Sequence, residues 1–405
     1  MIDFEPTEEQ TLMVTAVSQL AEKLRGAIRR TEEERGLSEE TRKTAFEMGL
    51  GGAVSVPESH GGAGLGLVTA VLLDEALAAG DPAAPFALGG PGAFASAIAE
   101  LGTAEQASAW ITRLSAHDRC GAVAWSEARP NRTRPGLSAL ATKDGDAWVL
   151  RGEKAFVLNA DRADAFVVFA QVDEAKGWSG VGAFVVDAKA DGVRVGARKS
   201  TLGLDAVGAC DVTLEGVRIT NDDRLLGGDE FTKAALRFFV KEGLKVASRA
   251  VGLSQSAVDI ALEYVSNRRA FGKPIGHFQA VAFTLADRAI DIDGARGLLR
   301  RAASLWDAFA AGTAQERDAL LTSAYAIAAS LEGAMRAGDD AVQLHGGAGF
   351  MRDYPVEKLM RDAKQLALCV MTKEQADQLA AAIELDMPLD PALVLPTPDL
   401  QAVFT

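Results

Sequence analysis

Residues that bind metals or form disulfides are scarce in this chain, which has 3 cysteines and 4 histidines among 405 residues. Cys120, Cys210 and Cys369 lie far apart and form no C-x-x-C pair, which argues against a zinc site or a redox pair. The histidines show no metal-ligand spacing. We therefore expect no metal centre. The absence of a cysteine framework in a chain of this length also fits a reducing compartment.

The sequence also lacks a surplus of basic residues and long apolar runs. Its 56 acidic residues outnumber 42 Lys and Arg, for a formal net charge of -14. A nucleic-acid-binding protein instead clusters Lys and Arg to displace counterions from phosphates. The first ten residues are polar and acidic, unlike a signal peptide, and no run offers the ~20 continuous apolar residues that span a bilayer. These absences predict a cytoplasmic protein with no membrane span and no nucleic-acid partner.

Local patterns along the chain follow an α–β–α order. Residues 1–118 have helical periodicity, residues 119–228 contain short β-rich runs separated by Gly and Asp, and residues 229–387 return to long Ala-rich helices. We predict an α+β fold with an N-terminal helical domain, a middle antiparallel β-domain and a C-terminal four-helix bundle. The proline-rich residues 388–405 are predicted to form an extended tail. The four long helices are expected at 231–266, 276–311, 315–344 and 355–384.

Three motifs stand out against this background. A Gly-rich turn, P-E-S-H-G-G-A-G-L-G at 57–66, has the wrong spacing for a dinucleotide fingerprint and no surrounding βαβ unit. Residues 268–279 read R-R-A-F-G-K-P-I-G-H-F-Q after an apolar helical run. Residues 343–350 read Q-L-H-G-G-A-G-F, followed by R-D-A-K at 361–364. In this order and at these spacings the motifs resemble the acyl-CoA dehydrogenase family of flavoproteins, over nearly the whole chain up to about residue 384.

The resemblance implies that FAD lies between the β-domain and the C-terminal helices, clamped by a neighbouring subunit. Arg268 matches the arginine that meets the flavin pyrophosphate, where a guanidinium can fork onto phosphate oxygens. It further implies an acyl-CoA substrate, electron-transfer flavoprotein as electron acceptor, and a homotetramer or a heterotetramer with a related subunit. The other residues that match the clamp, including two glycines that permit close backbone approach, are Phe271, Gln279, Gln343, Gly346 and Gly347.

On the side of the flavin ring the match is less complete. Trp125 and Ser126 begin the stretch that corresponds to the family's loop beside the isoalloxazine, with Ser126 where Thr is usual, but the Gly-rich part of that loop is missing. Phe156 keeps an aromatic side chain where the family has one, whereas Leu158 replaces the hydroxyl residue that usually bonds flavin N5. Thr372, at the end of the run that matches the family's Y-E-G-T motif, is also assigned to the cofactor site by the resemblance.

The identity of the catalytic base is the assignment on which the predicted reaction depends most. Most family members carry it as the Glu of Y-E-G-T, where this chain has Val370. A minority, including isovaleryl-CoA dehydrogenase, place it 26 positions before the clamp arginine, which here is Glu242. A carboxylate on an apolar helical face has its charged form disfavoured, so we expect a raised pKa. The alternative interpretation is an exposed Glu paired with Lys241 or Lys245.

The predicted function is FAD-dependent α,β-dehydrogenation of an acyl-CoA thioester, with the α-proton passing to Glu242 and the β-hydride to flavin N5. The alternative is a non-catalytic or half-site subunit of a heteromeric acyl-CoA dehydrogenase, resembling those that act on steroid side chains. Glu242 favours the first, and Leu158 with the missing Gly-rich loop favours the second. A third interpretation is a flavin enzyme of the same fold with another reaction, such as a nitroalkane oxidase or a flavin monooxygenase.

Overall fold

The computed structural model describes residues 6–129, 131, 133–225 and 229–389. The first of its helices, α1 (Glu8–Gly26), begins at Thr7, whose hydroxyl accepts from the backbone N–H of Gln10 while the Gln10 side chain accepts from that of Thr7. This reciprocal capping box satisfies backbone donors that the first helical turn leaves unpaired. The other N-terminal helices are α2 (Ile28–Glu34), α3 (Glu39–Glu47), α4 (Gly66–Ala78), α5 (Ala84–Ala87), α6 (Gly92–Leu101) and α7 (Ala104–Leu114).

The middle of the chain forms a seven-stranded sheet in the order β1-β4-β2-β3-β7-β6, with β5 also paired to β4. Most pairs are antiparallel, as predicted, but β1 and β2 both pair with β4 in parallel. Every residue of β4 is buried, which explains its continuous apolar run. The strands are β1 (Gly121–Ala124), β2 (Leu140–Asp144), β3 (Ala147–Leu158), β4 (Ala165–Gln171), β5 (Val181–Asp187), β6 (Val193–Val195) and β7 (Ala209–Thr220).

The C-terminal part is helical, as predicted, but the fourth expected helix is two. The segment between them contains Val370 at a φ of 60°, a left-handed conformation that a β-branched residue rarely adopts. Thr372 then caps the second helix. The predicted α+β fold, with helical, β and helical parts in that order, is confirmed. The helices are α8 (Asp229–Asn267), α9 (Gln279–Ala310), α10 (Glu316–Leu344), α11 (Val356–Leu366) and α12 (Lys373–Glu384). Most of the predicted tail lies outside the described residues.

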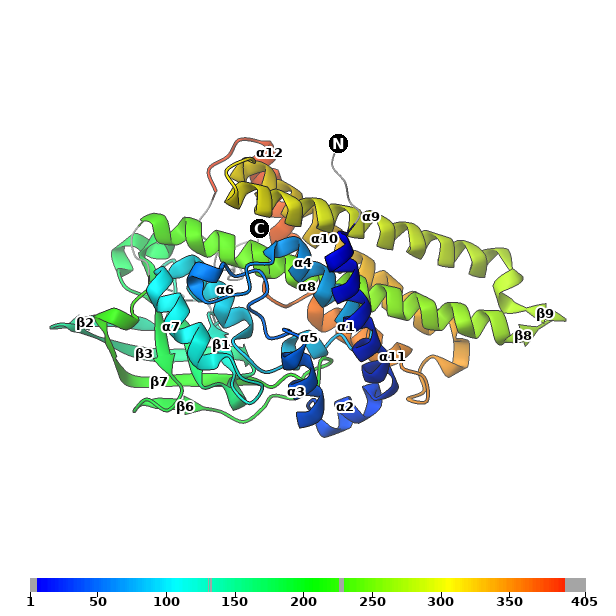
Figure 1. Cartoon of the computed structure of the whole chain (residues 1–405), viewed down its shortest axis with the longest axis horizontal. Helices are drawn as coiled ribbons and strands as arrows, with labels where there is room; N and C mark the ends of the chain where they lie inside the picture. Colours follow the sequence, from blue (N-terminus) through cyan, green and yellow to red (C-terminus); the bar gives the residue numbers. More distant parts are fainter. Residues whose placement is uncertain (1–5, 130, 132, 226–228, 390–405) are drawn as a thin grey trace.

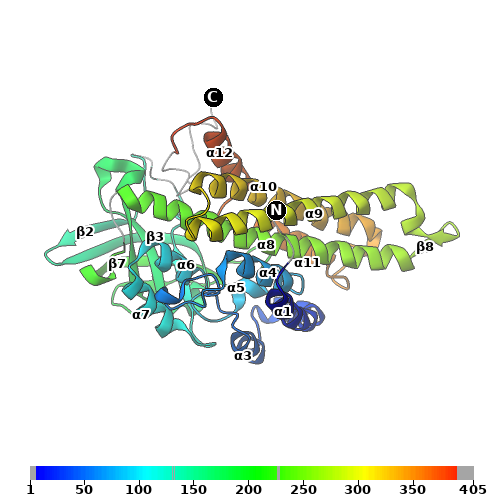
Figure 2. The ribbon, with the colours of Figure 1, turned by 45° about the horizontal axis from the view of Figure 1, so that its top comes forward.

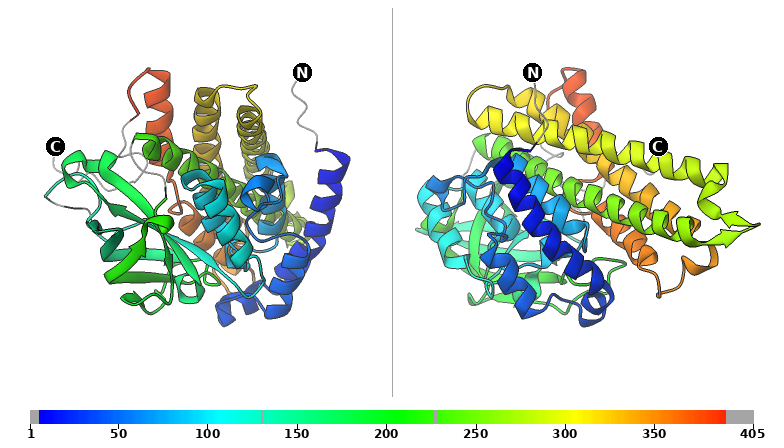
Figure 3. Two further views of the ribbon diagram at one scale, coloured as in Figure 1. Left: turned by 60° about the vertical axis from the view of Figure 1, so that its left-hand side comes forward. Right: turned by 45° about the vertical axis from the view of Figure 1, so that its right-hand side comes forward.

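The long helices α8, α9 and α10 run side by side along the molecule (Figures 1 and 2). The β-sheet lies at one end of them, and the hairpin of β8 (Arg269–Ala270) and β9 (Lys273–Pro274) lies at the other (Figure 1). The two views of Figure 3 look at the molecule from these two sides. The helix α4 packs against both α8 and α9, so the N-terminal helices cover one side of the bundle.

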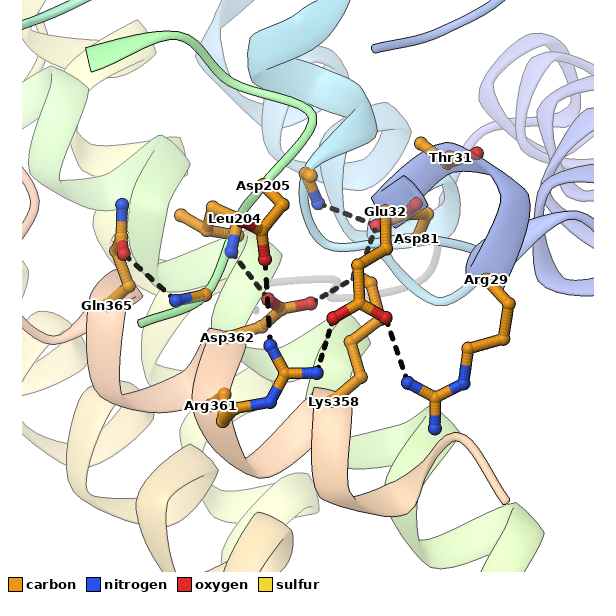
Figure 4. Close-up of polar contacts among 12 residues, drawn as sticks. Arg29, Thr31, Glu32, Asp81, Leu204, Asp205, Lys358, Arg361, Asp362 and Gln365 are labelled. Carbon is orange, nitrogen blue, oxygen red and sulfur yellow. Dashed lines mark hydrogen bonds and ion pairs between the residues drawn. The ribbon is translucent and has the colours of Figure 1, made fainter. Parts of the chain in front are cut away.

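A buried ionic cluster joins the three parts of the chain (Figure 4). The Lys358 Nζ on α11 lies 2.6 Å from Asp362 Oδ2 and 3.2 Å from Oδ1 of Asp81, which follows α4. Asp362 also accepts a 2.6 Å hydrogen bond from the backbone N–H of Leu204, in the loop before β7. Burial disfavours a charged Lys358, but the two carboxylates raise its pKa above its ordinary value. The cluster therefore fixes α11 against both other parts of the chain.

Candidate active site between the three parts of the chain

A cavity of about 540 Å³ lies where the N-terminal helices, the β-sheet and α8 meet. Four of the five residues predicted for the flavin-ring side line it: Trp125, Ser126, Phe156 and Leu158. Thr372, the fifth, is not among the lining residues; its hydroxyl accepts from the backbone of Gln375 at the start of α12. The structure thus brings the four ring-side residues of the β-domain to one wall of the cavity, whereas Thr372 belongs to the C-terminal helical part and is not in the lining.

A bulge in β3 gives this wall its shape. The pairing of β3 with β7 shifts register between Lys154 and Val157, so the residues between them leave the ladder. The backbone N–H of Ala155 donates to the carbonyl of Ser126 at 2.9 Å, which ties the loop after β1 to the bulge. Phe156 adopts a φ of 53°, is 55% exposed and lines the cavity. The strand irregularity therefore presents the aromatic ring to the cavity.

A buried ion pair supports the same loop from behind. Lys154 Nζ lies 2.9 Å from Glu127 Oε1 and donates to the carbonyl of Trp125 at 3.3 Å. Burial lowers the pKa of Lys154, because the attraction of Glu127 only partly offsets the loss of solvation. The Trp125 ring meets Phe239 of α8 edge-on, with 5.3 Å between ring centroids. These contacts hold the ring-side wall against the helix that carries Glu242.

Glu242 lies in the same cavity, and so does Val370. The Glu242 carboxylate is buried, and its Oε1 is 2.7 Å from the Nζ of Lys245, which also donates to Ser96 Oγ at 2.8 Å. Burial by itself would raise the pKa of Glu242, but the charges of Lys245 and Arg249 with hydrogen bonds from Lys245 and Ser96 lower it below its ordinary value. The expected raised pKa is therefore wrong. The carboxylate is buried as expected, but it is paired.

Sequence reasoning missed a row of charged residues that continues from Glu242 along α8. Lys245 and Arg249 follow at three and seven positions, and both line the cavity. Arg249 NH2 lies 2.7 Å from Asp74 Oδ2 of α4, and its guanidinium lies over the Phe86 ring at 4.1 Å. The available signal was charged residues at helical spacing on an otherwise buried helix face. Lys245 was considered only as the partner of an exposed Glu.

Three of the predicted clamp residues, Arg268, Phe271 and Gln279, lie on or next to the β8–β9 hairpin, which is at the opposite end of the bundle from the β-sheet (Figure 1). The other three, Gln343, Gly346 and Gly347, lie at the end of α10 and directly after it. All six are exposed, and Phe271 is 95% exposed at the tip of the β8–β9 hairpin. The Tyr264 ring stacks on His345 at 4.2 Å, which places the two sequence motifs side by side. Among the described residues the Arg268 guanidinium has no hydrogen-bond or ion-pair partner. The clamp motifs and the ring-side wall thus occupy separate regions of one chain.

Family models match in three consecutive ranges: the acyl-CoA dehydrogenase N-terminal domain at 7–118, the middle domain at 123–217 and the C-terminal domain at 232–369. This chain belongs to the acyl-CoA dehydrogenase family. The short-chain specific acyl-CoA dehydrogenase of Homo sapiens mitochondria is 33% identical over 313 residues, covering 77% of this chain and 74% of the human protein.

Two further relatives extend the range of the family. A subunit of the caffeyl-CoA reductase-Etf complex of Acetobacterium woodii is 32% identical over 312 residues, covering 77% of this chain and 80% of that subunit. The butyryl-CoA dehydrogenase structure of Megasphaera elsdenii has a TM-score of 0.86 at 27% identity and covers 95% of this chain and 100% of that one. The family therefore includes proteins named for oxidising and for reducing acyl-CoAs.

Two negative findings accompany the match. Within the ranges that the structure describes, no group of His, Cys, Asp and Glu side chains is arranged to hold a metal ion. In that same part of the chain, no helix combines the length and apolar character needed to cross a bilayer.

Proposed function

We propose that this chain is an FAD-dependent acyl-CoA dehydrogenase in which Glu242 removes the α-proton of the thioester. The observation that carries the proposal is the position of Glu242: its carboxylate shares one cavity with Trp125, Ser126 and Phe156, which the family resemblance assigns to the flavin ring. FAD, when bound, supplies the acceptor for the β-hydride. Anaerobic mixing of the FAD-loaded protein with saturated acyl-CoAs tests the proposal, because dehydrogenation bleaches the oxidised flavin.

The chain's own residues support a base at this position. Lys245 and Ser96 favour the ionised form of Glu242, so the carboxylate is ready to accept a proton. The lowered pKa reduces its proton affinity, so the Lys245 contact must weaken as the proton is transferred. Lys245 retains the Ser96 hydroxyl as a second partner when that happens. Glu242 lies on the same cavity as Val370, the position of the base in most family members, which supports the assignment.

The exposed clamp supports FAD as the cofactor and a second subunit as its other half. Arg268 has no side-chain partner within the described part of the chain and can pair with a pyrophosphate. A side chain would find open space at both Gly346 and Gly347, so a ligand can approach the backbone closely there. The Phe271 ring is 95% exposed and meets Phe278 edge-on at 6.1 Å between centroids, so the hairpin offers an aromatic surface to a second subunit. We infer that each flavin is held between the cavity of one subunit and the clamp of another.

Replacing Arg268 with Ala is expected to weaken FAD binding roughly 10- to 150-fold, the equivalent of about 1.5–3 kcal/mol for a hydrogen bond to a charged group. The fold should be unaffected, because Arg268 has no side-chain partner among the described residues. Flavin titration of the apoprotein measures the effect. Arg269→Ala is the matched control, since the Arg269 guanidinium donates within the hairpin to the carbonyl of Gly272. Equal FAD affinity in both variants would remove Arg268 from the cofactor site.

The assembly is expected to be a homotetramer, or a heterotetramer with a related subunit. The hairpin that begins with β8 lies at the end of the bundle opposite the β-sheet (Figure 2), and that sheet supplies one wall of the cavity, so a flavin clamp at the hairpin serves an adjacent chain. Sedimentation analysis of the FAD-loaded protein should give a mass well above that of one 42.5 kDa chain. A stable monomer that keeps its FAD would contradict the shared site. We also propose an electron-transfer flavoprotein as the electron acceptor, because the Acetobacterium woodii relative belongs to a reductase-Etf complex.

A second candidate function is a half-site subunit that supplies the clamp to a catalytic partner. Leu158 favours it: the residue lines the cavity as a leucine where the resemblance predicts a hydroxyl donor to flavin N5. The backbone of β3 must then supply any hydrogen bond at that place. Co-expression with a related subunit, followed by measurement of flavin per tetramer, separates the two functions. Two flavins per heterotetramer favour the half-site function, and four flavins favour catalytic sites in every chain.

A further inference from the structure

Beyond Glu242 the wall of the cavity contains further charged side chains. Lys245 and Arg249 extend from the same face of α8, and at a rise of 1.5 Å per residue Arg249 lies about 10 Å along the helix from Glu242. Asp74 faces them from α4 and also lines the cavity. The side chains of Lys245 and Arg249 are only 7% and 8% exposed, so their charges are shielded from bulk water. Charged groups are thus built into the cavity wall beyond the candidate base.

Lys245, Arg249 and Asp74 have hydrogen-bonding groups beyond those that their mutual contacts use, and a ligand can bond to these. Lys245 has three N–H donors, of which Glu242 and Ser96 take one each. Arg249 directs its Nε and NH2 groups to the same atom, Asp74 Oδ2, at 2.9 and 2.7 Å. Oδ1 of Asp74 accepts no hydrogen bond from the residues that the structure describes. The far end of the row therefore presents both a free acceptor and an arginine.

The formal charges of these side chains and Glu242 add up to zero. Two cations, Lys245 and Arg249, face two carboxylates, Glu242 and Asp74. A further carboxylate brought in by a ligand would be a buried charge without a matching cation, which is unfavourable. An aliphatic chain would cover polar groups without pairing them, which costs the desolvation of each unsatisfied group. A hydroxyl can donate to one carboxylate and accept from the arginine without adding charge.

We propose that Asp74 and Arg249 select an acyl chain that carries a neutral oxygen, a hydroxyl or oxo group, beyond the carbons that react. This inference rests on the proposed acyl-CoA function, because it places the thioester at Glu242 and the remainder of the chain along α8. The physical precedent is that a site built to hydrogen-bond a substrate oxygen discriminates strongly against the analogue that lacks it. Asp74 and Arg249 are specificity residues in this scheme: neither accepts the proton, although the charge of Arg249 contributes to the lowered pKa of Glu242.

The test compares three CoA thioesters of one length on the FAD-loaded protein: hexanoyl-CoA, 6-hydroxyhexanoyl-CoA and adipoyl-CoA. Calorimetric titration measures binding, and anaerobic flavin bleaching measures reaction. The wild type is expected to bind 6-hydroxyhexanoyl-CoA at least ~10-fold more tightly than either of the others. The double variant Asp74→Leu/Arg249→Met removes both charges together and should reduce that preference to near unity. Arg237→Met/Glu316→Leu removes an ion pair that does not line the cavity and should retain the wild-type preference.

The two readouts separate this inference from the function on which it rests. Equal binding of hexanoyl-CoA and 6-hydroxyhexanoyl-CoA by the wild type overturns the inference, even if both bleach the flavin. A preference that survives in Asp74→Leu/Arg249→Met overturns it as well. Conversely, selective binding of the hydroxylated thioester without any bleaching supports the inference and contradicts dehydrogenation by this chain. Tighter binding of adipoyl-CoA than of the other two also overturns it, because the row would then act as an anion site.

Discussion

Glu242→Gln is expected to lower the rate of flavin bleaching by an acyl-CoA at least ~10²-fold, the low end for loss of a general base. The amide keeps the shape of the side chain and its oxygen can still accept from Lys245, which bonds the carboxylate at 2.7 Å. The substitution removes only the ability of this side chain to take up a proton. FAD content should stay that of the wild type. Stopped-flow absorbance of the reductive half-reaction measures the rate.

The matched control is Glu100→Gln, which removes a carboxylate paired with Lys241 and absent from the cavity lining. It should reduce flavin at the wild-type rate. Adding Val370→Glu to the Glu242→Gln variant is expected to restore part of the lost rate, because residue 370 lines the same cavity. Rapid bleaching by Glu242→Gln would rule out the base role and leave the half-site function as the better account of the chain.

Lys358→Met should destabilise the protein by about 3–5 kcal/mol, the usual cost of removing one partner from a buried ion pair. The substitution leaves Asp81 and Asp362 facing each other, both fully buried and deprived of their shared cation. Burial already raises the pKa of Asp362 above its ordinary value although Lys358 is present. Asp362 also accepts from the backbone N–H of Leu204, so the carboxylate that loses Lys358 is one that joins α11 to the loop before β7 (Figure 4). Urea unfolding followed by circular dichroism measures the change.

Lys373→Met is the control for this prediction. Lys373 and Asp377 also form a Lys–Asp pair four residues apart with an N–O distance of 2.6 Å, but their side chains are 37% and 52% exposed. Its removal should leave the urea midpoint close to that of the wild type, because water and salt screen an exposed helical pair. If the two Lys→Met variants unfold at the same urea concentration, burial is not what makes the Lys358 cluster important.

Several features could be predicted from the sequence because they depend on neighbouring residues or on periodicity. The long helices and the β-rich middle of the chain follow local rules, and the structure has them close to the predicted positions. The prediction of one helix over 355–384 is wrong, because the chain turns at Val370. That residue has a left-handed backbone conformation, which is disfavoured for valine and could not be predicted from composition. That turn brings Val370 to the cavity wall.

The sequence alone determined the family, the α+β fold and the candidates Glu242 and Arg268, because all of these follow from motifs and from their spacing along the chain. Only the tertiary structure decided the electrostatic state of Glu242. Burial and the ion pair with Lys245 act on its pKa in opposite directions, and their balance depends on Ser96, 146 positions earlier in the chain, as well as on Arg249. The pairing of Asp74 with Arg249 was likewise invisible, because α4 and α8 meet only when the chain folds.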